Sequence, residues 1–182
     1  MVRKLKFHEQ KLLKKVDFIT WKVDNAGKEA KVLRRYHIRK PADYTKYNKL
    51  SREIRTLCEK IANLDKSDTF KMEAAMMLLE KLYLMGLIRN KAELEAASRV
   101  SASCFCRRRL PVIMVKNQLS QNLKNATDLI EQGHVRVGPD MITDPAFLVS
   151  RNLEDFVTWV DSSKIKQHVL NYNDQRDDFA LV

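Results

Sequence analysis

Glycine and proline are scarce in this chain, with 4 of each in 182 residues. Such small numbers argue against a long flexible linker between domains. No apolar run approaches the ~20 residues of a membrane-spanning helix, and the basic start at Arg3 and Lys4 is followed by further charge rather than by the apolar core of a secretory signal. With 45% hydrophobic residues, we expect one or two small folded domains in an intracellular protein with no membrane partner.

Cysteine is also rare, and its three copies, Cys58, Cys104 and Cys106, are an odd number. They are too few for a disulfide framework, so we expect free thiols in a reducing compartment. Cys104 and Cys106 are separated by a single residue, and no second pair of Cys or His lies near them in sequence to complete four tetrahedral ligands. The sequence therefore predicts no metal site.

Catalytic motifs are missing as well. The first 100 residues lack a Gly-rich phosphate loop, a His-Glu metal motif and a nucleophile beside a plausible base. His8, His37 and His168 stand alone in the sequence, and the aspartates between 174 and 178 are typical of solvated charge near a chain end. We therefore expect neither an enzyme nor a bound cofactor.

Negative charge is in short supply, because the formal net charge is +11. Residues 1–60 contain 18 Lys and Arg against 7 Asp and Glu, whereas residues 121–182 contain 6 against 10. Such a basic region is the footprint of a polyanion binder, since each phosphate neutralised by Lys or Arg releases condensed counterions. An acidic membrane fits less well, because no lipidation motif or strongly aromatic amphipathic helix accompanies the charge.

Residues 1–40 are interpreted as a basic arm. Lysines within residues 3–22 alternate with apolar side chains such as Phe7 and Trp21, and part of this segment fits a helix. A solvated basic face and an arm lying along RNA are about equally compatible with this run of charge. The candidate RNA contacts of the arm are Arg3, Lys4 and Lys6.

Residues 41–106 are predicted to be helical. Apolar residues recur at spacings of three and four after Pro41, which indicates a helix with one buried stripe. Pro41 and Asp43 suit the first turn of this helix. The stripe is expected to contain Tyr47, Leu50, Ile54, Leu57, Ile61 and Leu64, with Lys46, Lys49, Arg52, Arg55 and Lys60 on the opposite side.

A second helix is expected to begin at Ser67 or Asp68, either of which can cap it, and to end at Gly86. A short third helix should follow over residues 92–99, with Asn90 as its cap. Methionines at helical spacing are more often core filler than a partner surface, so we interpret those of the second helix and its end as core. They are Met72, Met76, Met77 and Met85.

Three consecutive arginines, Arg107, Arg108 and Arg109, precede Pro111. On a helix of 3.6 residues per turn they would fan across roughly two-thirds of the circumference, so some of them must face a partner. Guanidinium groups can grip phosphates in bidentate fashion. A solvated cluster explains the three residues equally well when they are considered alone.

The following segment predicts a helix and then a hairpin. The helix begins at the candidate N-cap Asn122 and ends at Gly133, and residues 134–138 form a strand that leads into a turn. His134 and Arg136 share one face of this strand, while two valines share the other. We therefore expect a hairpin that packs its apolar side on helices and offers its polar side to a partner.

This arrangement resembles the S-four-type RNA-binding domain of ribosomal small-subunit protein four. The chain departs from the family at Asn122-Leu123, where the family has Ser-Arg, and at Gly138-Pro139, where it has Asn-Gly. The first departure removes one phosphate contact, which Lys124 can partly replace. The residues that match are Arg108-Arg109-Leu110, Ala126, Leu129-Ile130, Gly133-His134-Val135-Arg136-Val137, Pro145 and Val149.

The resemblance implies an α+β fold in which a mostly helical amino-terminal region is followed by an S-four-type RNA-binding domain of helices packed on a small β-hairpin. The expected boundaries are 1–40 for the basic arm, 41–106 for the helical region, 107–172 for the domain with a carboxy-terminal extension, and 173–182 for an acidic tail. The RNA contacts expected in the domain are Arg107, Arg108, Arg109, Lys116, Asn122, Lys124, His134 and Arg136.

The chain resembles this family through nearly its whole length, and it resembles most the branch that belongs to the U3 small nucleolar ribonucleoprotein. This resemblance rests on residues 1–17, 82–86, 106–114, 130–139 and 151–166. That resemblance implies an RNA-binding ribosome-assembly factor of the small-subunit processome, in the nucleus and nucleolus, that helps U3 small nucleolar RNA pair with precursor ribosomal RNA during rRNA processing. The implied partners are these two RNAs, a large acidic Mpp-type scaffold protein and other processome proteins. A structural ribosomal small-subunit protein is the alternative, which the acidic carboxy-terminal end disfavours.

Overall fold

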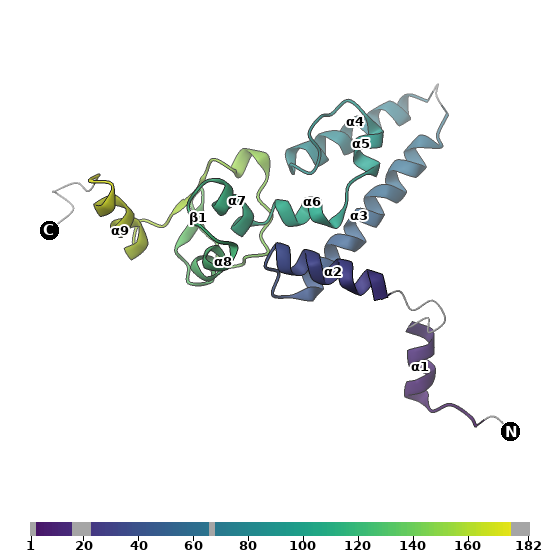
Figure 1. Cartoon of the computed structure of the whole chain (residues 1–182). Coiled ribbons are helices and arrows are strands. Elements are labelled where there is room, and N and C mark those ends of the chain that lie inside the picture. The colour runs from purple at the N-terminus through teal and green to yellow at the C-terminus, as the bar shows by residue number, and fades with distance from the viewer. Residues whose placement is uncertain (1–2, 16–22, 66–67, 176–182) are drawn as a thin grey trace. The chain divides into compact units, whose positions relative to one another are not determined.

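The computed structural model describes residues 3–15, 23–65 and 68–175 in two compact units, Met1–Arg35 and Tyr36–Val182 (Figure 1). The first unit contains α1 (Phe7–Lys15), which lies in the segment expected to be partly helical, and α2 (Val23–Arg35), which was not predicted because Gly27 was interpreted as a break. The carboxylate of Glu9 anchors the start of α1, because it accepts hydrogen bonds from Arg3 Nη2 at 2.6 Å and from the Lys6 backbone N at 2.8 Å. Residues 16–22, which include Trp21, lie outside the described residues.

In the second unit, α3 (Pro41–Ala62) is the long helix predicted to follow Pro41. The prediction of its buried stripe was wrong in part, because Leu50 and Leu57 are 41% and 48% exposed. At 3.6 residues per turn, positions 47, 51, 54, 58 and 61 stay on one side of a helix, whereas 50 and 57 turn away from it. The buried residues of α3 are accordingly Asp43, Tyr47, Ser51, Ile54, Cys58 and Ile61.

The next helix, α4 (Thr69–Leu84), has both of its predicted end signals. The carboxylate of Asp68 accepts a hydrogen bond from the Phe70 backbone N at 2.9 Å, which caps the start of the helix. Gly86 follows the helix with a φ of +74°, and the Leu87 N–H donates to the Leu82 carbonyl at 3.0 Å. This closure needs a left-handed residue, for which glycine is best suited.

The methionines of α4 do not belong to the core, so the prediction was wrong for these three, whereas Met85, just after the helix, is half-buried. Met72, Met76 and Met77 are 66%, 69% and 64% exposed, and buried positions of α4 are taken by leucines. The third helix is shorter than predicted, because α5 spans Leu94–Ser98 and its N-cap is Glu93 rather than Asn90.

Residues after α5 form α6 (Ala102–Arg107), α7 (Leu110–Lys116) and α8 (Leu123–Glu131), followed by three short strands. The predicted hairpin is confirmed: β1 (Val135–Val137) pairs antiparallel with β2 (Asp140–Met141). The other edge of β1 pairs antiparallel with β3 (Val157–Trp159), a strand that was not predicted. The sheet order is β2-β1-β3. The 3₁₀ helix η1 (Arg151–Leu153) precedes β3, and α9 (Lys164–Tyr172) follows it.

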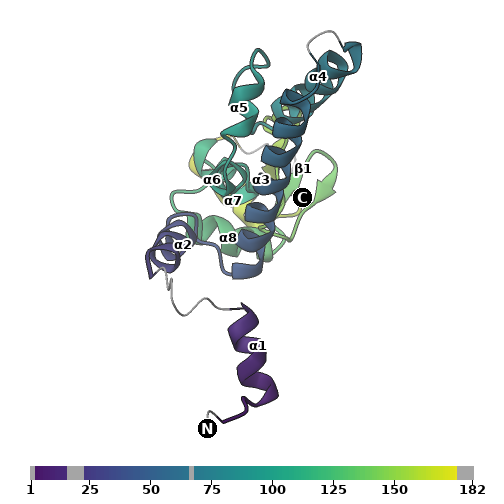
Figure 2. The same cartoon turned by 90° about the vertical axis from the view of Figure 1, so that its right-hand side faces the viewer.

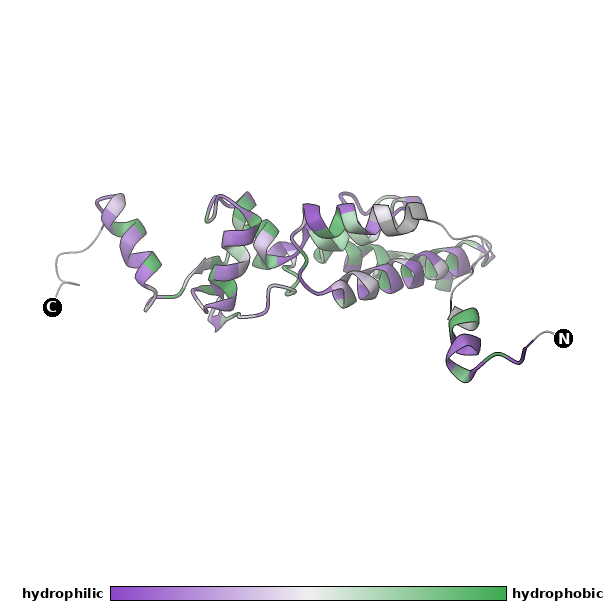
Figure 3. Cartoon of the chain, turned by 60° about the horizontal axis from the view of Figure 1, so that its bottom comes forward, coloured by the Kyte–Doolittle hydropathy of each residue, from purple (hydrophilic) through white to green (hydrophobic). Residues whose placement is uncertain are grey.

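One hydrophobic core fills the part of the fold formed by α7, α8 and the sheet. Figure 2 shows α6, which leads into α7, beside α3, and Figure 3 shows polar and apolar residues intermingled along the helices, as expected for amphipathic elements. Val135 and Val137 point into the core, which confirms the predicted face of β1. The core residues are Leu110, Ile113, Met114, Ala126, Ile130, Val135, Val137, Val149 and Val157.

Within the described ranges, the chain has no helix long and apolar enough to cross a membrane. Nor do the described residues contain a group of three or more His, Cys, Asp or Glu side chains that could hold a metal ion. The α+β class expected from the sequence is confirmed by these helices and by the antiparallel sheet.

Candidate nucleic-acid interface

The three arginines singled out by the sequence have different surroundings. Arg107 ends α6, is exposed, and places its Nη2 3.3 Å from Cys104 Sγ. Arg108 and Arg109 are only 9% and 3% exposed. The backbone turns after Arg107 and pairs with residues 147–149, with Leu110 N donating to Phe147 O at 2.9 Å. Of these three arginines, only Arg107 is therefore exposed for direct contact.

Arg108 ties α6 to the segment before β3. Its Nε and Nη2 donate to the Val149 carbonyl at 2.9 and 2.7 Å, and its Nη1 donates to Glu154 at 2.9 Å. Lys116 bonds the other oxygen of the same carboxylate. The hydrogen bond from Lys116, together with Arg108, lowers the pKa of Glu154 despite its partial burial. We call this group of hydrogen bonds, which joins Arg108 and Lys116 to Val149 and Glu154, the hub. The hub holds the end of α7 beside η1.

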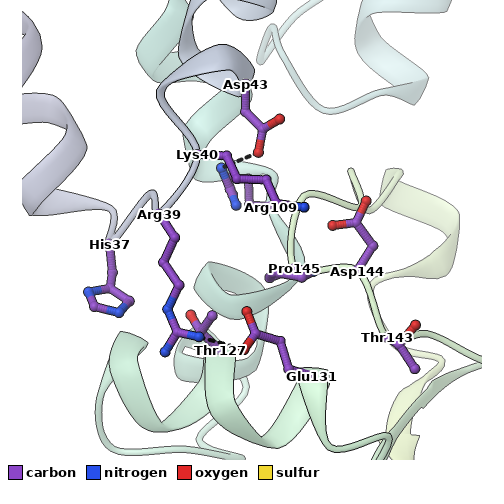
Figure 4. Close-up of a pocket in the computed structure, with 10 residues that line it drawn as sticks. All are labelled: His37, Arg39, Lys40, Asp43, Arg109, Thr127, Glu131, Thr143, Asp144 and Pro145. Carbon is purple, nitrogen blue, oxygen red and sulfur yellow. Dashed lines mark hydrogen bonds and ion pairs between the residues drawn. The ribbon is translucent and has the colours of Figure 1, made fainter.

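Arg109 lies in a cleft of about 350 Å³ between the start of α3 and the S-four-type domain (Figure 4). Its Nη1 is 3.6 Å from Asp43 of α3, too far for a hydrogen bond, and its Nε is buried without a hydrogen-bond partner among the described residues. Arg39, in the same cleft, reaches across to Glu131 at 2.5 Å and to Asp128 of α8. These ion pairs fasten the segment before α3 to the domain.

A polar cluster covers the outer face of β1. Arg136 donates to Thr158 Oγ1 at 3.1 Å and to Asp161 at 2.6 Å, and Lys166 donates to Asp161 at 2.5 Å. Lys166 and Arg136 hold the pKa of Asp161 below its ordinary value. His134 Nδ1 lies 3.0 Å from Ser163 Oγ. Arg136 and Lys166 share the exposed carboxylate of Asp161. The cluster therefore contains two cations and one anion.

The turn between α7 and α8 presents the remaining candidates. Lys116 is exposed but shares Glu154 with Arg108. Gln118 has a φ of +60°, which lets the chain reverse direction there. Asn122 occupies the N-cap position of α8, yet its side chain makes no cap hydrogen bond, and Lys124 is exposed in the first turn. Four exposed amides, those of Asn117, Gln118, Gln121 and Asn122, thus stand with two lysines at one end of the helix pair.

The structure brings together some of the predicted residues and separates others. Arg136 lies on the sheet, and His134 directly precedes β1. Lys116, Asn122 and Lys124 lie at the α7–α8 turn, and Arg108 and Arg109 lie inside the fold. The three arm residues Arg3, Lys4 and Lys6 are exposed in the other unit. Sequence reasoning missed Thr158, Asp161 and Lys166. The sequence signal for the strand that positions them was the alternation of Val157, Thr158 and Trp159, which is only three residues long.

This surface suits noncovalent binding of a polyanion. Its cations stand on a sheet and on a helix end, where they can meet a phosphate backbone, and amide side chains beside them can bond sugar or base edges. The pair of helices packed on a small antiparallel sheet, with this polar outer face, defines the chain as an RNA-binding protein built on an S-four-type (S4) domain.

Comparison with known proteins gives the family. The model described as the ribosomal protein S4/S9 N-terminal domain matches residues 4–104, and the S4 domain model matches residues 108–155. The U3 small nucleolar ribonucleoprotein protein IMP3 of Mus musculus is 58% identical over 182 residues, which is 100% of this chain and 99% of that protein. IMP3 of Saccharomyces cerevisiae is 51% identical over 180 residues, covering 98% of each chain.

More distant similarity links the chain to a ribosomal protein. The small ribosomal subunit protein uS4 of Sulfurisphaera tokodaii is 28% identical over 149 residues, which is 81% of this chain and 83% of that protein. The chain belongs to the family of the U3 small nucleolar ribonucleoprotein protein IMP3, within the wider group of ribosomal S4 proteins.

Proposed function

We propose that this chain is a non-enzymatic RNA-binding factor of ribosome assembly, located in the nucleolus within the small-subunit processome. In this role it helps U3 small nucleolar RNA pair with precursor ribosomal RNA during small-subunit rRNA processing. Full-length similarity to IMP3 proteins, together with the exposed cations of the S4 domain, is the observation that supports the proposal. Its further partners are an acidic Mpp-type scaffold protein and other processome proteins.

Within the S4 domain, the proposed RNA surface has two parts. One part contains His134 and Arg136 at the sheet, and the other contains the helix ends of the domain. Arg108 and Arg109 are not proposed as direct contacts, because these residues are buried. The full set of direct contacts is Arg107, Lys116, Asn122, Lys124, His134 and Arg136 in the domain, with Arg3, Lys4 and Lys6 in the arm.

Charge neutralisation is the proposed mechanism. Two RNA strands repel each other through their phosphates, and a cationic protein that neutralises some of these phosphates favours pairing and speeds encounter. No bond is made or broken in the protein. Lys116 and Arg136 are paired with Glu154 and Asp161 in the free protein, so each exchanges a carboxylate for a phosphate when RNA binds.

A strand-annealing assay with the full chain tests this function. Replacing Arg107 and Lys124 with Gln removes two exposed charges without touching the buried hub. We expect weaker RNA binding, slower annealing, and a salt dependence of log affinity that is less steep by about 0.7–0.9 for each phosphate that the variant no longer neutralises. Lys46→Gln is the control, because it removes the same kind of charge from the exposed side of α3, away from the proposed contacts. Wild-type affinity and annealing in the Arg107→Gln/Lys124→Gln variant at moderate salt would contradict the proposal.

A structural protein of the small ribosomal subunit is the second candidate, because uS4 shares 28% identity with this chain over 149 residues. Cofractionation separates the two functions. An assembly factor sediments with precursor particles and is absent from translating subunits, whereas a resident ribosomal protein remains in them. Recovery of the chain from polysomes in amounts equal to those of ribosomal proteins would favour the second function.

A further inference from the structure

Large apolar side chains stand on most sides of the helix α4, interrupted by the exposed Glu73 and Glu80. Leu79 and Leu82 are buried on one side, as a helix packed on its neighbours requires. Large apolar side chains nevertheless remain exposed on its other sides. A helix of this kind normally lies in the interior of a larger protein or assembly. These exposed residues are Phe70, Met72, Met76, Met77 and Leu84.

Part of this apolar surface forms a groove of about 410 Å³ between α3 and α4. Leu57 and Ile61, four residues apart on α3, line one wall together with Leu64, which lies just after the helix. Phe70 and Met77 stand on the facing wall, 58% and 64% exposed. The complete lining is Leu57, Lys60, Ile61, Leu64, Phe70, Ala74, Met77 and Leu78. An apolar groove between two packed helices is the kind of surface that receives the apolar face of an amphipathic helix.

The charges at this groove decide which kind of partner it fits. Lys71 is turned inward, where its Nζ donates to the carbonyls of Ala62 and Leu64 at 2.9 and 2.7 Å. Lys60 lines the groove, and Lys81 follows Met77 by one helical turn on the same side of α4. Within the described part of the chain, neither Lys60 nor Lys81 forms an ion pair. An apolar floor with two unpaired lysines is poorly suited to a phosphate backbone and complements an apolar stripe flanked by carboxylates.

We propose that the α3–α4 groove receives an amphipathic helix of a partner protein, with acidic residues beside its apolar stripe that meet Lys60 and Lys81. Methionine suits such a groove, because its flexible and polarisable side chain adapts to the knobs of a bound helix. This site goes beyond the RNA contacts: it lies on the helical region and uses none of the residues of the S4 domain. Loss of helix binding therefore leaves RNA binding intact.

Photo-crosslinking in the intact cellular complex tests the proposal. A benzophenone side chain is placed at Met77 in the groove or, as a matched control, at Met72, which is equally exposed but points to the opposite side of α4. The crosslinked product is then identified by mass spectrometry. We expect the probe at Met77 to capture one segment of another protein, with apolar residues at intervals of three and four and Asp or Glu beside them, and the probe at Met72 to capture it much less.

Substitutions give the second readout. Phe70→Ser and Met77→Ser should each weaken retention of the captured partner about tenfold, as at the centre of an interface. Lys60→Glu should weaken it about two- to fivefold, as expected for an exposed ion pair, and RNA affinity should be unchanged in all three variants. Capture of RNA, of residues 3–15 of this chain or of a second copy, or an absence of crosslinks from Met77, would overturn the proposal.

Discussion

The backbone of Gly86 lies directly against the guanidinium group of Arg108. A Cβ atom added at Gly86 would be 2.8 Å from both Cζ and Nε of Arg108, closer than such atoms can approach. The same glycine has a φ of +74°. The residue that ends α4 thus also makes room for the side chain that holds Val149 and Glu154.

Gly86→Ala is predicted to lower the free energy of unfolding by about 2 kcal/mol or more, because a left-handed alanine is unfavourable by ~1 kcal/mol and the guanidinium must also move. Urea denaturation measures the change. Gly138 is the matched control, since its φ is +62° and no atom lies within 4 Å of an added Cβ. Gly138→Ala should lose only the backbone contribution. Equal losses at the two positions would contradict a role for the Arg108 contact.

Glu154→Gln is predicted to destabilise the fold by about 1.5–3 kcal/mol near neutral pH, the range for hydrogen bonds to charged groups. The folded pKa of Glu154 is lowered, so the ionised carboxylate stabilises the fold above its unfolded pKa of about 4.3. That stabilisation is lost as the pH falls through the lower folded pKa. Denaturation series from neutral to acidic pH should therefore show a smaller acid-induced loss in the variant, whereas Glu73→Gln, an exposed change on α4, should leave the profile as it was.

Asp161→Asn is predicted to strengthen RNA binding several-fold, because it releases both Arg136 and Lys166 from one carboxylate. Stability should change little, since this carboxylate is 65% exposed. Asp155→Asn is the control: it adds the same net charge at an exposed position of the same domain. Titrations at several salt concentrations measure both variants. An equal gain from the two substitutions would mean that net charge alone acts and that Arg136 makes no contact.

Cys104 is predicted to be the most reactive of the three thiols. Burial acts to raise its pKa, but hydrogen bonds from Ser101 and Arg107 outweigh that effect and lower it. Burial raises the pKa of Cys58, and that of Cys106 to about 11. Alkylation near neutral pH, followed by mass spectrometry, should modify Cys104 first. Arg107→Ala should slow this reaction, and faster labelling of Cys58 than of Cys104 would contradict the assignment.

The predictions that succeeded rest on local signals. α3 and α4 could be placed because Pro41, Asp68 and Gly86 act within one turn of the helix that they begin or end. The hairpin could be placed because alternation in β1 is bounded by glycines. The exposure of Leu50 and Leu57 could not be foreseen, since spacings of three and four fit more than one helix face. The packing of α3 against α4, α5 and α6 decides which of its faces is buried, and these helices follow α3 in the sequence.

The surroundings of the arginines are set by distant segments. Three adjacent guanidinium groups look alike in the sequence, and local geometry requires only that some of them be exposed. Val149 and Glu154 withdraw Arg108 from solvent, and the start of α3 covers Arg109. No residue near the cluster in sequence signals these contacts. Strand β3 was missed for a related reason: three residues are too few for alternation to be distinguished from chance.

The burial of Arg108 and Arg109 also determines how genetic variation in this cluster will have to be interpreted. In a growth-based scan of every substitution, changes at these two positions will group with those at the core residue Leu110, because all three reduce the amount of folded protein. Changes at Arg107 will group with surface positions and keep abundance near normal. A phenotype at Arg107 therefore reports on RNA recognition. A phenotype at Arg108 or Arg109 reports on the amount of folded protein.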